Sequence, residues 1–222
     1  MEFNAIIFDM DGLLVDSEPV WHEVEVELIE SCGYTYSDEV RAMGIGMRPD
    51  EFAAILQRHY PELGDSPAAI ETTIINGMLN LPPGRIKARP GADELVRYVA
   101  ESGIPRAIAS SSSQAIIEHF VALMDWDELI PQRYSAEFMP RGKPAPDIYL
   151  HAAAQLGCAP ETCLALEDSR LGTQAALAAG MTCFTVPDPS HSSLTDFAAI
   201  NDKIYRSLHD VLDEFKLKRI FA

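Results

Sequence analysis

The stretch Ala-Ile-Ile-Phe-Asp-Met-Asp-Gly at residues 5–12 decides the fold, because an unbroken apolar run ends there in two closely spaced aspartates. Similar apolar runs follow at residues 107–109, 163–166 and 183–186. Short runs that are apolar throughout are typical of strands buried on both faces, as in a parallel sheet. Helical patterns ending in glycine lie between the later runs. This alternation predicts an α/β fold, a doubly wound, Rossmann-like parallel-sheet core.

Residues 18–82 break the alternation, because they contain helical patterns and no convincing buried strand. The candidate helices cover residues 20–31, 49–59 and 67–79. The Pro-Pro-Gly sequence at 82–84 marks the return to the core. We therefore predict an all-helical cap domain at 18–82, inserted into an α/β core of residues 1–17 and 83–222. At the end of that core, residues 202–222 predict a short strand and an amphipathic helix.

The chain is strongly acidic, with a formal net charge of −17. This charge repels nucleic acid and anionic membranes, so we expect neither as a partner. It repels phosphorylated substrates too, so a phosphate site would need local positive charge from a metal, a lysine and backbone N–H groups. No apolar run reaches the roughly 18 residues of a membrane helix. The first residues lack the positive segment of a signal peptide, and we expect a cytoplasmic protein.

Polar side chains follow the first three apolar runs. In open α/β sheets, ligands bind at the carboxyl ends of the strands, so these side chains should meet at one edge. The residues are Asp9, Asp11, Ser110, Glu167 and Asp168, with Lys143 in a loop before a helix. Two carboxylates 4 Å apart repel by roughly 4 kcal/mol at an effective dielectric constant of about 20. A divalent cation would relieve this repulsion, and Mg²⁺ suits an oxygen-lined site that also binds phosphate.

Residues 8–17, Phe-Asp-Met-Asp-Gly-Leu-Leu-Val-Asp-Ser, resemble the first motif of the haloacid-dehalogenase superfamily of phosphohydrolases. Ser110, the Lys143-Pro144 pair and residues 167–169 match the second, third and fourth motifs in order. A single D-x-D-G is weak evidence, whereas four ordered motifs are specific. Residues 16–19 and the position of the cap resemble the subgroup of beta-phosphoglucomutase and 2-deoxyglucose-6-phosphatase. The resemblance implies a monomer that acts on a small-molecule phosphate ester.

The resemblance also implies a mechanism for a Mg²⁺-dependent phosphomonoester hydrolase. Asp9 would attack phosphorus and form an aspartyl-phosphate. Asp11 would protonate the leaving alcohol and then take a proton from the hydrolytic water. Ser110 and Lys143 would hold the phosphoryl oxygens, with Ser111 in place of Ser110 if the register shifts by one. The implied metal ligands are Asp9, the carbonyl oxygen of Asp11, Asp168, and Glu167 directly or through water.

We expect the cap to recognise the substrate, and its candidate residues are Arg48, Trp21 and His22. In the resembled mutases, an arginine at the position of Arg48 reaches the distal part of the substrate. Those mutases carry a histidine where this chain has Trp21, and they must protect their aspartyl-phosphate from water. We therefore favour hydrolysis of a small sugar or polyol phosphate, with a beta-phosphoglucomutase-like reaction as the alternative. A phosphate-binding regulatory domain, similar to receiver domains, is a further alternative, although receiver domains lack this cap.

Overall fold

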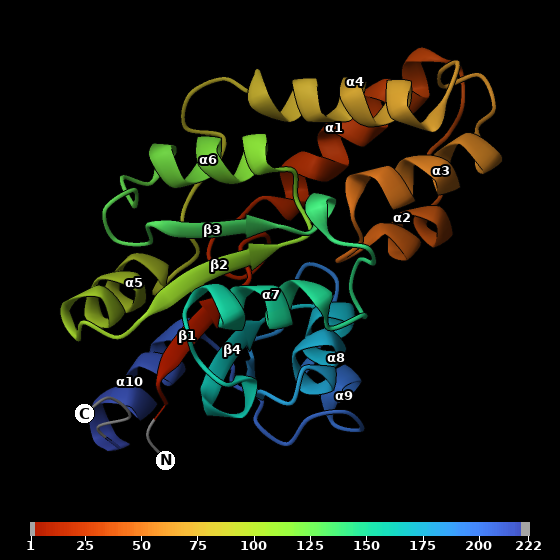
Figure 1. Ribbon diagram of the computed structural model, residues 1–222. Helices are drawn as coiled ribbons and strands as arrows, with labels where there is room; N and C mark the ends of the chain where they lie inside the picture. Colours follow the sequence, from red (N-terminus) through yellow and green to blue (C-terminus); the bar gives the residue numbers. More distant parts are fainter. Residues whose placement is uncertain (1–2, 219–222) are drawn as a thin grey trace.

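The computed structural model describes residues 3–218 and contains a five-stranded parallel sheet (Figure 1). Its strands are β1 (Ala5–Phe8), β2 (Arg106–Ser110), β3 (Gln132–Ser135), β4 (Cys163–Glu167) and β5 (Thr182–Thr185). Their order is β3-β2-β1-β4-β5, and each neighbouring pair is parallel. The predicted doubly wound α/β core is confirmed.

The central strand β1 is buried on both faces, which explains its unbroken apolar sequence. Ile6 and Phe8 belong to the apolar cluster on one face, and Ala5 and Ile7 to the cluster on the other. The first cluster includes side chains from α5 (Ala92–Glu101), α6 (Gln114–Leu123) and α10 (Leu208–Lys218). The second includes side chains from α7 (Asp147–Gln155) and α8 (Arg170–Ala178).

The strand β3 was not predicted from the sequence. It reads Gln-Arg-Tyr-Ser and lies at an edge of the sheet, where three of its four residues are only partly buried. An edge strand pairs with one neighbour and needs no apolar run, so the pattern that revealed the other strands is absent here.

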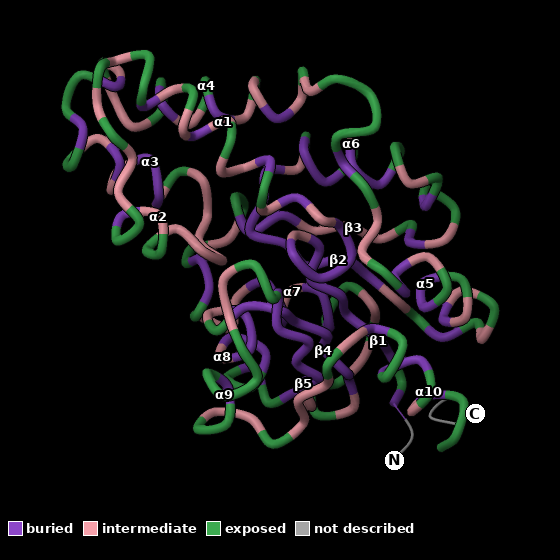
Figure 2. The backbone as a smooth tube through the Cα atoms, turned by 180° about the vertical axis from the view of Figure 1, so that it is seen from behind, coloured by how far each residue is buried: buried purple, intermediate pink, exposed green. Residues whose placement is uncertain are grey.

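Residues 18–79 form four helices, and none of these residues lies in a strand of the sheet. The helices are α1 (Glu18–Ser31), α2 (Asp38–Gly44), α3 (Pro49–His59) and α4 (Pro67–Leu79). The three helices expected here correspond to α1, α3 and α4, whereas α2 was not predicted. The helices enclose an apolar cluster of their own, with Ile29, Leu56 and Ile70 fully buried. Figures 1 and 2 show this layer beside the sheet, with many exposed segments on its outer side.

The last part of the described chain differs in one detail from expectation. α10 is the predicted terminal helix. In place of the short strand expected before it, the structure has an isolated bridge between Thr185 and Ile204. Short helices complete the described residues: η1 (Ala136–Phe138), η2 (Pro160–Thr162) and α9 (Leu194–Phe197). Residues 1–2 and 219–222 of the predicted core lie outside the described residues. Within 3–218, no helix is both long and apolar enough to cross a bilayer.

Candidate active site

The three central strands, β2, β1 and β4, bring the predicted residues to one edge of the sheet. Asp9 directly follows β1, while Ser110 and Glu167 end β2 and β4. Lys143 Nζ lies 2.6 Å from Asp9 Oδ1 and 2.6 Å from Glu167 Oε1. Burial alone would lower the pKa of Lys143, but the two carboxylates outweigh it and raise that pKa. The ammonium therefore stays charged beside Asp9.

Glu167 is fully buried, and both of its oxygens are engaged. Besides Lys143, Oε1 accepts a hydrogen bond from the Tyr149 hydroxyl at 2.5 Å. Oε2 accepts bonds from the backbone N–H groups of Asp168 and Ser169 and from the Ser169 hydroxyl, at 3.2 to 3.3 Å. These contacts make Glu167 a support for Lys143 and for the turn after β4, and leave its oxygens little capacity for a direct metal bond.

The carboxylate of Asp11 accepts four hydrogen bonds. Ser17 and Trp21, at the start of α1, donate to Oδ1 at 2.7 and 3.1 Å. Ser110, the last residue of β2, and Ser112, in the loop that follows, donate to Oδ2 at 3.2 and 2.8 Å. Trp21 thus orients Asp11 through its indole N–H, a contact that the sequence did not predict.

The neighbouring Ser111 faces a different partner. Its hydroxyl donates to the carbonyl oxygen of Gly46, in the segment between α2 and α3, at 2.9 Å. Ser110 and Ser111 both line the same pocket as Asp9 and Lys143. The loop after β2 therefore contacts both the core carboxylate and the helical layer.

The carboxylates at this edge form a plausible site for a divalent cation. Asp9, Glu167 and Asp168 each place an oxygen within 4.8 Å of the others, and all three are buried. Asp168 Oδ1 is buried without a hydrogen-bond partner. Burial raises the pKa of Asp9 despite Lys143, and burial with the charges of Asp9 and Glu167 raises that of Asp168. A cation held by hard oxygens would relieve this crowding, so the residues fit Mg²⁺. Asp9 and Asp168 are the best-placed ligands.

The pocket above these carboxylates is closed by the helical layer. Its upper wall is mixed: Ile45, Met47, Pro49 and Phe52 contribute apolar surface, and α1 and α2 contribute Glu18, Trp21, His22, Glu25 and Arg41. Burial raises the pKa of Glu18 to about 8, with a further contribution from Asp11. Burial also raises the pKa of Glu25 to about 7, although that carboxylate accepts a hydrogen bond from Tyr36 at 2.7 Å. At neutral pH these carboxyls can therefore donate as well as accept hydrogen bonds.

Comparison with known proteins shows the family to which the chain belongs. Residues 3–180 match the family model of the haloacid dehalogenase-like hydrolases. The chain belongs to this family. Hexitol phosphatase B of Escherichia coli O157:H7 is 34% identical over 201 residues, which cover 90% of each chain. A probable pseudouridine-5'-phosphatase of Drosophila melanogaster is 31% identical over 192 residues, 82% of this chain and 81% of that protein. The crystal structure of CbbY from Rhodobacter sphaeroides in complex with phosphate has a TM-score of 0.82 and 26% identity, and the match covers 94% and 96% of the two chains.

One residue predicted for this haloacid dehalogenase-like hydrolase lies elsewhere. Arg48 does not line the pocket. Its guanidinium donates to the carbonyl oxygens of Ala136 and Met139, at 3.1 and 2.9 Å, and pairs with Asp50 and Glu51. Arg48 therefore ties the start of α3 to the core. Trp21 and His22 do line the pocket, and their role in substrate recognition stays a prediction.

Several residues near the site were missed by sequence reasoning, among them Glu18 and Glu25 in the pocket wall. Arg41 lines the pocket from α2, a helix that was not predicted. Ser112 was not predicted because it lies in a run of four serines. The one available signal was that alternate residues of an extended chain face the same side, which would pair Ser112 with Ser110. Tyr149 lies within α7, whose apolar face gives no sign of a polar contact. The other predicted residues of this hydrolase come together at the edge of the sheet.

Proposed function

We propose that this hydrolase cleaves the phosphomonoester bond of a small sugar or polyol phosphate. The observation that carries the proposal is the convergence of Asp9, Asp11 and Lys143 on one pocket, whose upper wall includes charged side chains. Several relatives, hexitol phosphatase B among them, are named as phosphatases, and a hexitol is a polyol. The net charge of −17 supports a small-molecule substrate rather than a nucleic acid.

In the first step, a carboxylate oxygen of Asp9 attacks phosphorus and the bond from phosphorus to the leaving oxygen breaks. The leaving alkoxide takes its proton from Asp11, so Asp11 must enter this step protonated. Lys143, 2.6 Å from Asp9 Oδ1, and the Ser110 hydroxyl hold the phosphoryl oxygens. The products of this step are the free alcohol and the aspartyl-phosphate on Asp9.

In the second step, Asp11, now ionised, takes a proton from a water molecule. The resulting hydroxide attacks the phosphorus, and the bond to Asp9 breaks to release inorganic phosphate. Mg²⁺ bound by Asp9, Asp168 and the carbonyl oxygen of Asp11 would supply positive charge opposite the phosphoryl oxygens. Asp11 ends protonated, as it began, which closes the cycle.

The helical layer is the proposed recognition element, and we assign residues 18–82 to a cap domain and residues 1–17 and 83–222 to the core. An apolar cluster formed by side chains of α1–α4 supports this division, although Val20 and Met78 pack in a cluster of the sheet. The side chains of Glu18, Glu25 and Arg41 offer both hydrogen-bond donors and acceptors to the pocket. Such a wall suits a leaving group that carries several hydroxyls.

Hydrolysis is favoured over the mutase reaction by the position of Trp21. Its indole N–H donates to Asp11 Oδ1 at 3.1 Å, where the resembled mutases carry a histidine. A mutase would have to protect its aspartyl-phosphate from water until the bound intermediate has reoriented in the pocket. Conversion of beta-glucose 1-phosphate to glucose 6-phosphate with little free phosphate would favour the mutase alternative.

The test is phosphate release from hexitol, hexose, nucleoside and glycolate phosphates, each with and without Mg²⁺. We expect Mg²⁺-dependent release that is fastest for a hexitol or hexose phosphate. Asp9→Asn should release no phosphate while its thermal unfolding stays close to that of the wild type. Substantial turnover by this variant would show that Asp9 is not the nucleophile.

Asp11→Asn separates the two steps when the leaving group needs no proton. With p-nitrophenyl phosphate, we expect a burst of one nitrophenol per chain, because formation of the aspartyl-phosphate needs no acid. Hydrolysis of that intermediate should then slow by about 100-fold or more, because it needs the base. Steady turnover without a burst, at the wild-type rate, would contradict the role of Asp11.

A further inference from the structure

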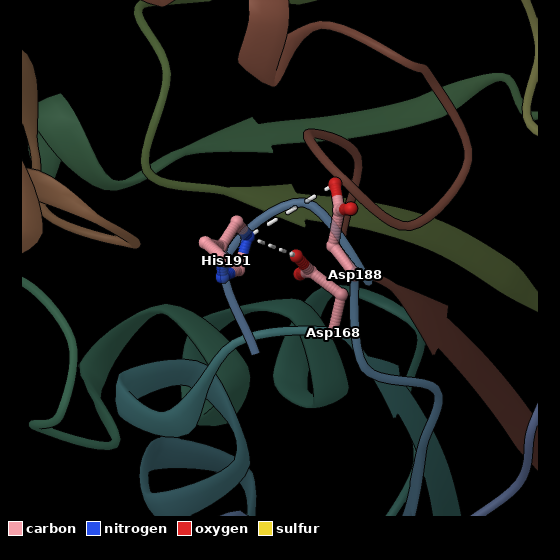
Figure 3. A group of neighbouring side chains, drawn as sticks. All are labelled: Asp168, Asp188 and His191. Atoms are coloured by element: carbon pink, nitrogen blue, oxygen red, sulfur yellow. Dashed lines mark ion pairs between the residues drawn. The ribbon is translucent and has the colours of Figure 1, made fainter. Parts of the chain in front are cut away.

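A second group of potential metal ligands lies behind the proposed catalytic site. Figure 3 shows Asp168, Asp188 and His191 pointing toward one another. Asp168 follows β4, and the other two come from the loop after β5. His191 Nε2 lies 3.7 Å from Asp168 Oδ2 and 4.0 Å from Asp188 Oδ2, beyond hydrogen-bond distance.

The group is buried and incompletely bonded. The side chains of Asp168, Asp188 and His191 are 3%, 0% and 6% exposed. Within residues 3–218, six buried side-chain atoms lack a hydrogen-bond partner. Two of them, Asp188 Oδ2 and His191 Nε2, face each other in this group, and a third, Asp168 Oδ1, belongs to the carboxylate that the group shares with the Mg²⁺ site. Buried polar atoms in native proteins are nearly always bonded, so such a concentration indicates a missing ligand.

The surrounding chain holds these atoms in place and keeps space beside them. Arg89 lies 3.2 Å from Asp188 Oδ1, and the backbone N–H of Ser190 donates to the same oxygen at 2.8 Å, so Oδ2 is left facing the group. Gly12 packs against both aspartates. A Cβ at this position would lie 2.2 Å from Asp168 Oδ2 and 3.3 Å from Asp188 Oδ2. The absence of a side chain at Gly12 therefore keeps the space next to both oxygens open.

The separations suit a single ion. A metal about 2.1 Å from each ligand atom keeps its ligand atoms between about 3 and 4.2 Å apart. The observed 3.7 and 4.0 Å lie in this range. One imidazole nitrogen with two carboxylate oxygens favours a first-row transition metal such as Mn²⁺ or Zn²⁺ over Mg²⁺, which prefers oxygen alone.

We propose that Asp168, Asp188 and His191 bind a second divalent cation, of the Mn²⁺ or Zn²⁺ type, next to the proposed Mg²⁺ site. Asp168 belongs to both sites, and its Oδ2 is the oxygen nearest His191 Nε2. The second ion would hold the shared carboxylate, that of Asp168, in one orientation.

The test counts bound Mn²⁺ by equilibrium dialysis against Mn²⁺ alone. We expect two ions per wild-type chain and one in His191→Phe, which removes the ligand nitrogen and keeps a ring of similar size. Asp188→Asn, a nearly isosteric change, should also bind one. The matched control His59→Ala, at an exposed position in α3, should bind two.

A single Mn²⁺ in the wild type, or two in either site variant, would overturn the proposal and leave a bridging water as the partner of these atoms. The number of Mn²⁺ ions bound by Asp9→Asn distinguishes failure of this proposal from failure of the proposed function. This variant should keep the His191-dependent ion, because Asp9 lies outside the group, whatever its phosphate release.

Discussion

At the scale of single residues, Asp11 is held by donors of two kinds. Ser17, Ser110 and Ser112 contribute hydroxyls, which can rotate and can also accept. Trp21 contributes an indole N–H, which only donates. A fixed donor disfavours a proton on the oxygen that it faces, so in the proposed mechanism Trp21 favours Oδ2 of Asp11 as the oxygen that carries the transferable proton.

Trp21→Phe keeps the ring and removes this N–H. A hydrogen bond to a charged group contributes about 1.5 to 3 kcal/mol, so we expect kcat with an alkyl phosphate to fall roughly 10- to 100-fold. The matched control is Trp126→Phe, because Trp126 donates to Asp93 at 3.0 Å, away from the pocket. Trp126→Phe should lower Tm and leave kcat unchanged. Equal kcat values for Trp21→Phe and the wild type would contradict the orienting role.

Glu25 makes stability depend on pH. Burial raises its pKa to about 7, whereas an unfolded glutamate titrates near about 4.3. Between these values the unfolded state loses a proton that the folded state keeps, so stability falls as pH rises and levels off above about 7. The expected loss is on the order of 3 kcal/mol. Urea unfolding at pH 4.5 and 8 should show a smaller loss for Glu25→Gln.

The control for this comparison is Glu27→Gln, at an exposed position of the same helix. Its unfolding free energy should change with pH as that of the wild type does. The same pH dependence in Glu25→Gln would show that Glu25 ionises normally in the folded chain.

The residues that sequence could predict are those tied to the end of a strand or to a motif. Asp9, Ser110 and Asp168 follow apolar runs, and Lys143 precedes a helix, so topology alone brings them together. Arg41 could not be predicted, because its contact with the pocket depends on how the helical layer sits over the sheet.

At the scale of elements, the turn after β1 depends on Gly12. Its φ of +76° is costly for other residues, and a Cβ would lie 2.2 Å from Asp168 Oδ2. Gly33 has a similar φ of +82°, but no atom lies within 4 Å of its Cβ position. A substitution at Gly33 therefore measures the cost of backbone strain alone, whereas the same substitution at Gly12 adds the steric contact with Asp168.

Gly33→Ala should cost about 1 to 2 kcal/mol of stability and leave turnover unchanged. Gly12→Ala should also displace Asp168 and lower kcat by roughly 100-fold, because small displacements of catalytic groups cost that much. Urea unfolding and steady-state kinetics measure both effects. Equal turnover in the two variants would mean that Asp168 does not need its present position.

The elements that sequence missed share a physical cause. β3 lies at an edge and α2 has only seven residues, with Val40 as its one buried side chain. Neither element buries enough apolar side chains to produce a recognisable apolar periodicity in the sequence. β1, α3 and α4 were predicted with their observed bounds, because burial and prolines mark them.

At the scale of the whole molecule, the helical layer has an apolar cluster that is largely its own. Leu56 is fully buried in it, whereas Val20 and Met78, from the same layer, belong to a cluster of the sheet. Because the two clusters share few side chains, we predict that the two parts open independently. This supports the assignment of 18–82 as a domain, which was inferred from the loss of strand patterns.

Leu56→Ala tests this independence. The lost packing should cost about 2 to 5 kcal/mol within the helical layer. Amide hydrogen exchange should accelerate in α1, α3 and α4 while β1 and β4 keep their protection. The control Leu164→Ala, at a fully buried position of β4, should accelerate exchange in the sheet. Uniform acceleration in Leu56→Ala would mean that the chain unfolds as one unit.

The serine run at 110–113 looks redundant in the sequence, but its members are not interchangeable. Ser110 and Ser112 donate to Asp11 in the core, whereas Ser111 between them donates to Gly46 in the helical layer. A deletion of one serine would leave the local composition almost unchanged and shift these residues onto each other's positions. The run can therefore tolerate a change of residue more readily than a change of length, so insertions and deletions here should be rarer in evolution than substitutions.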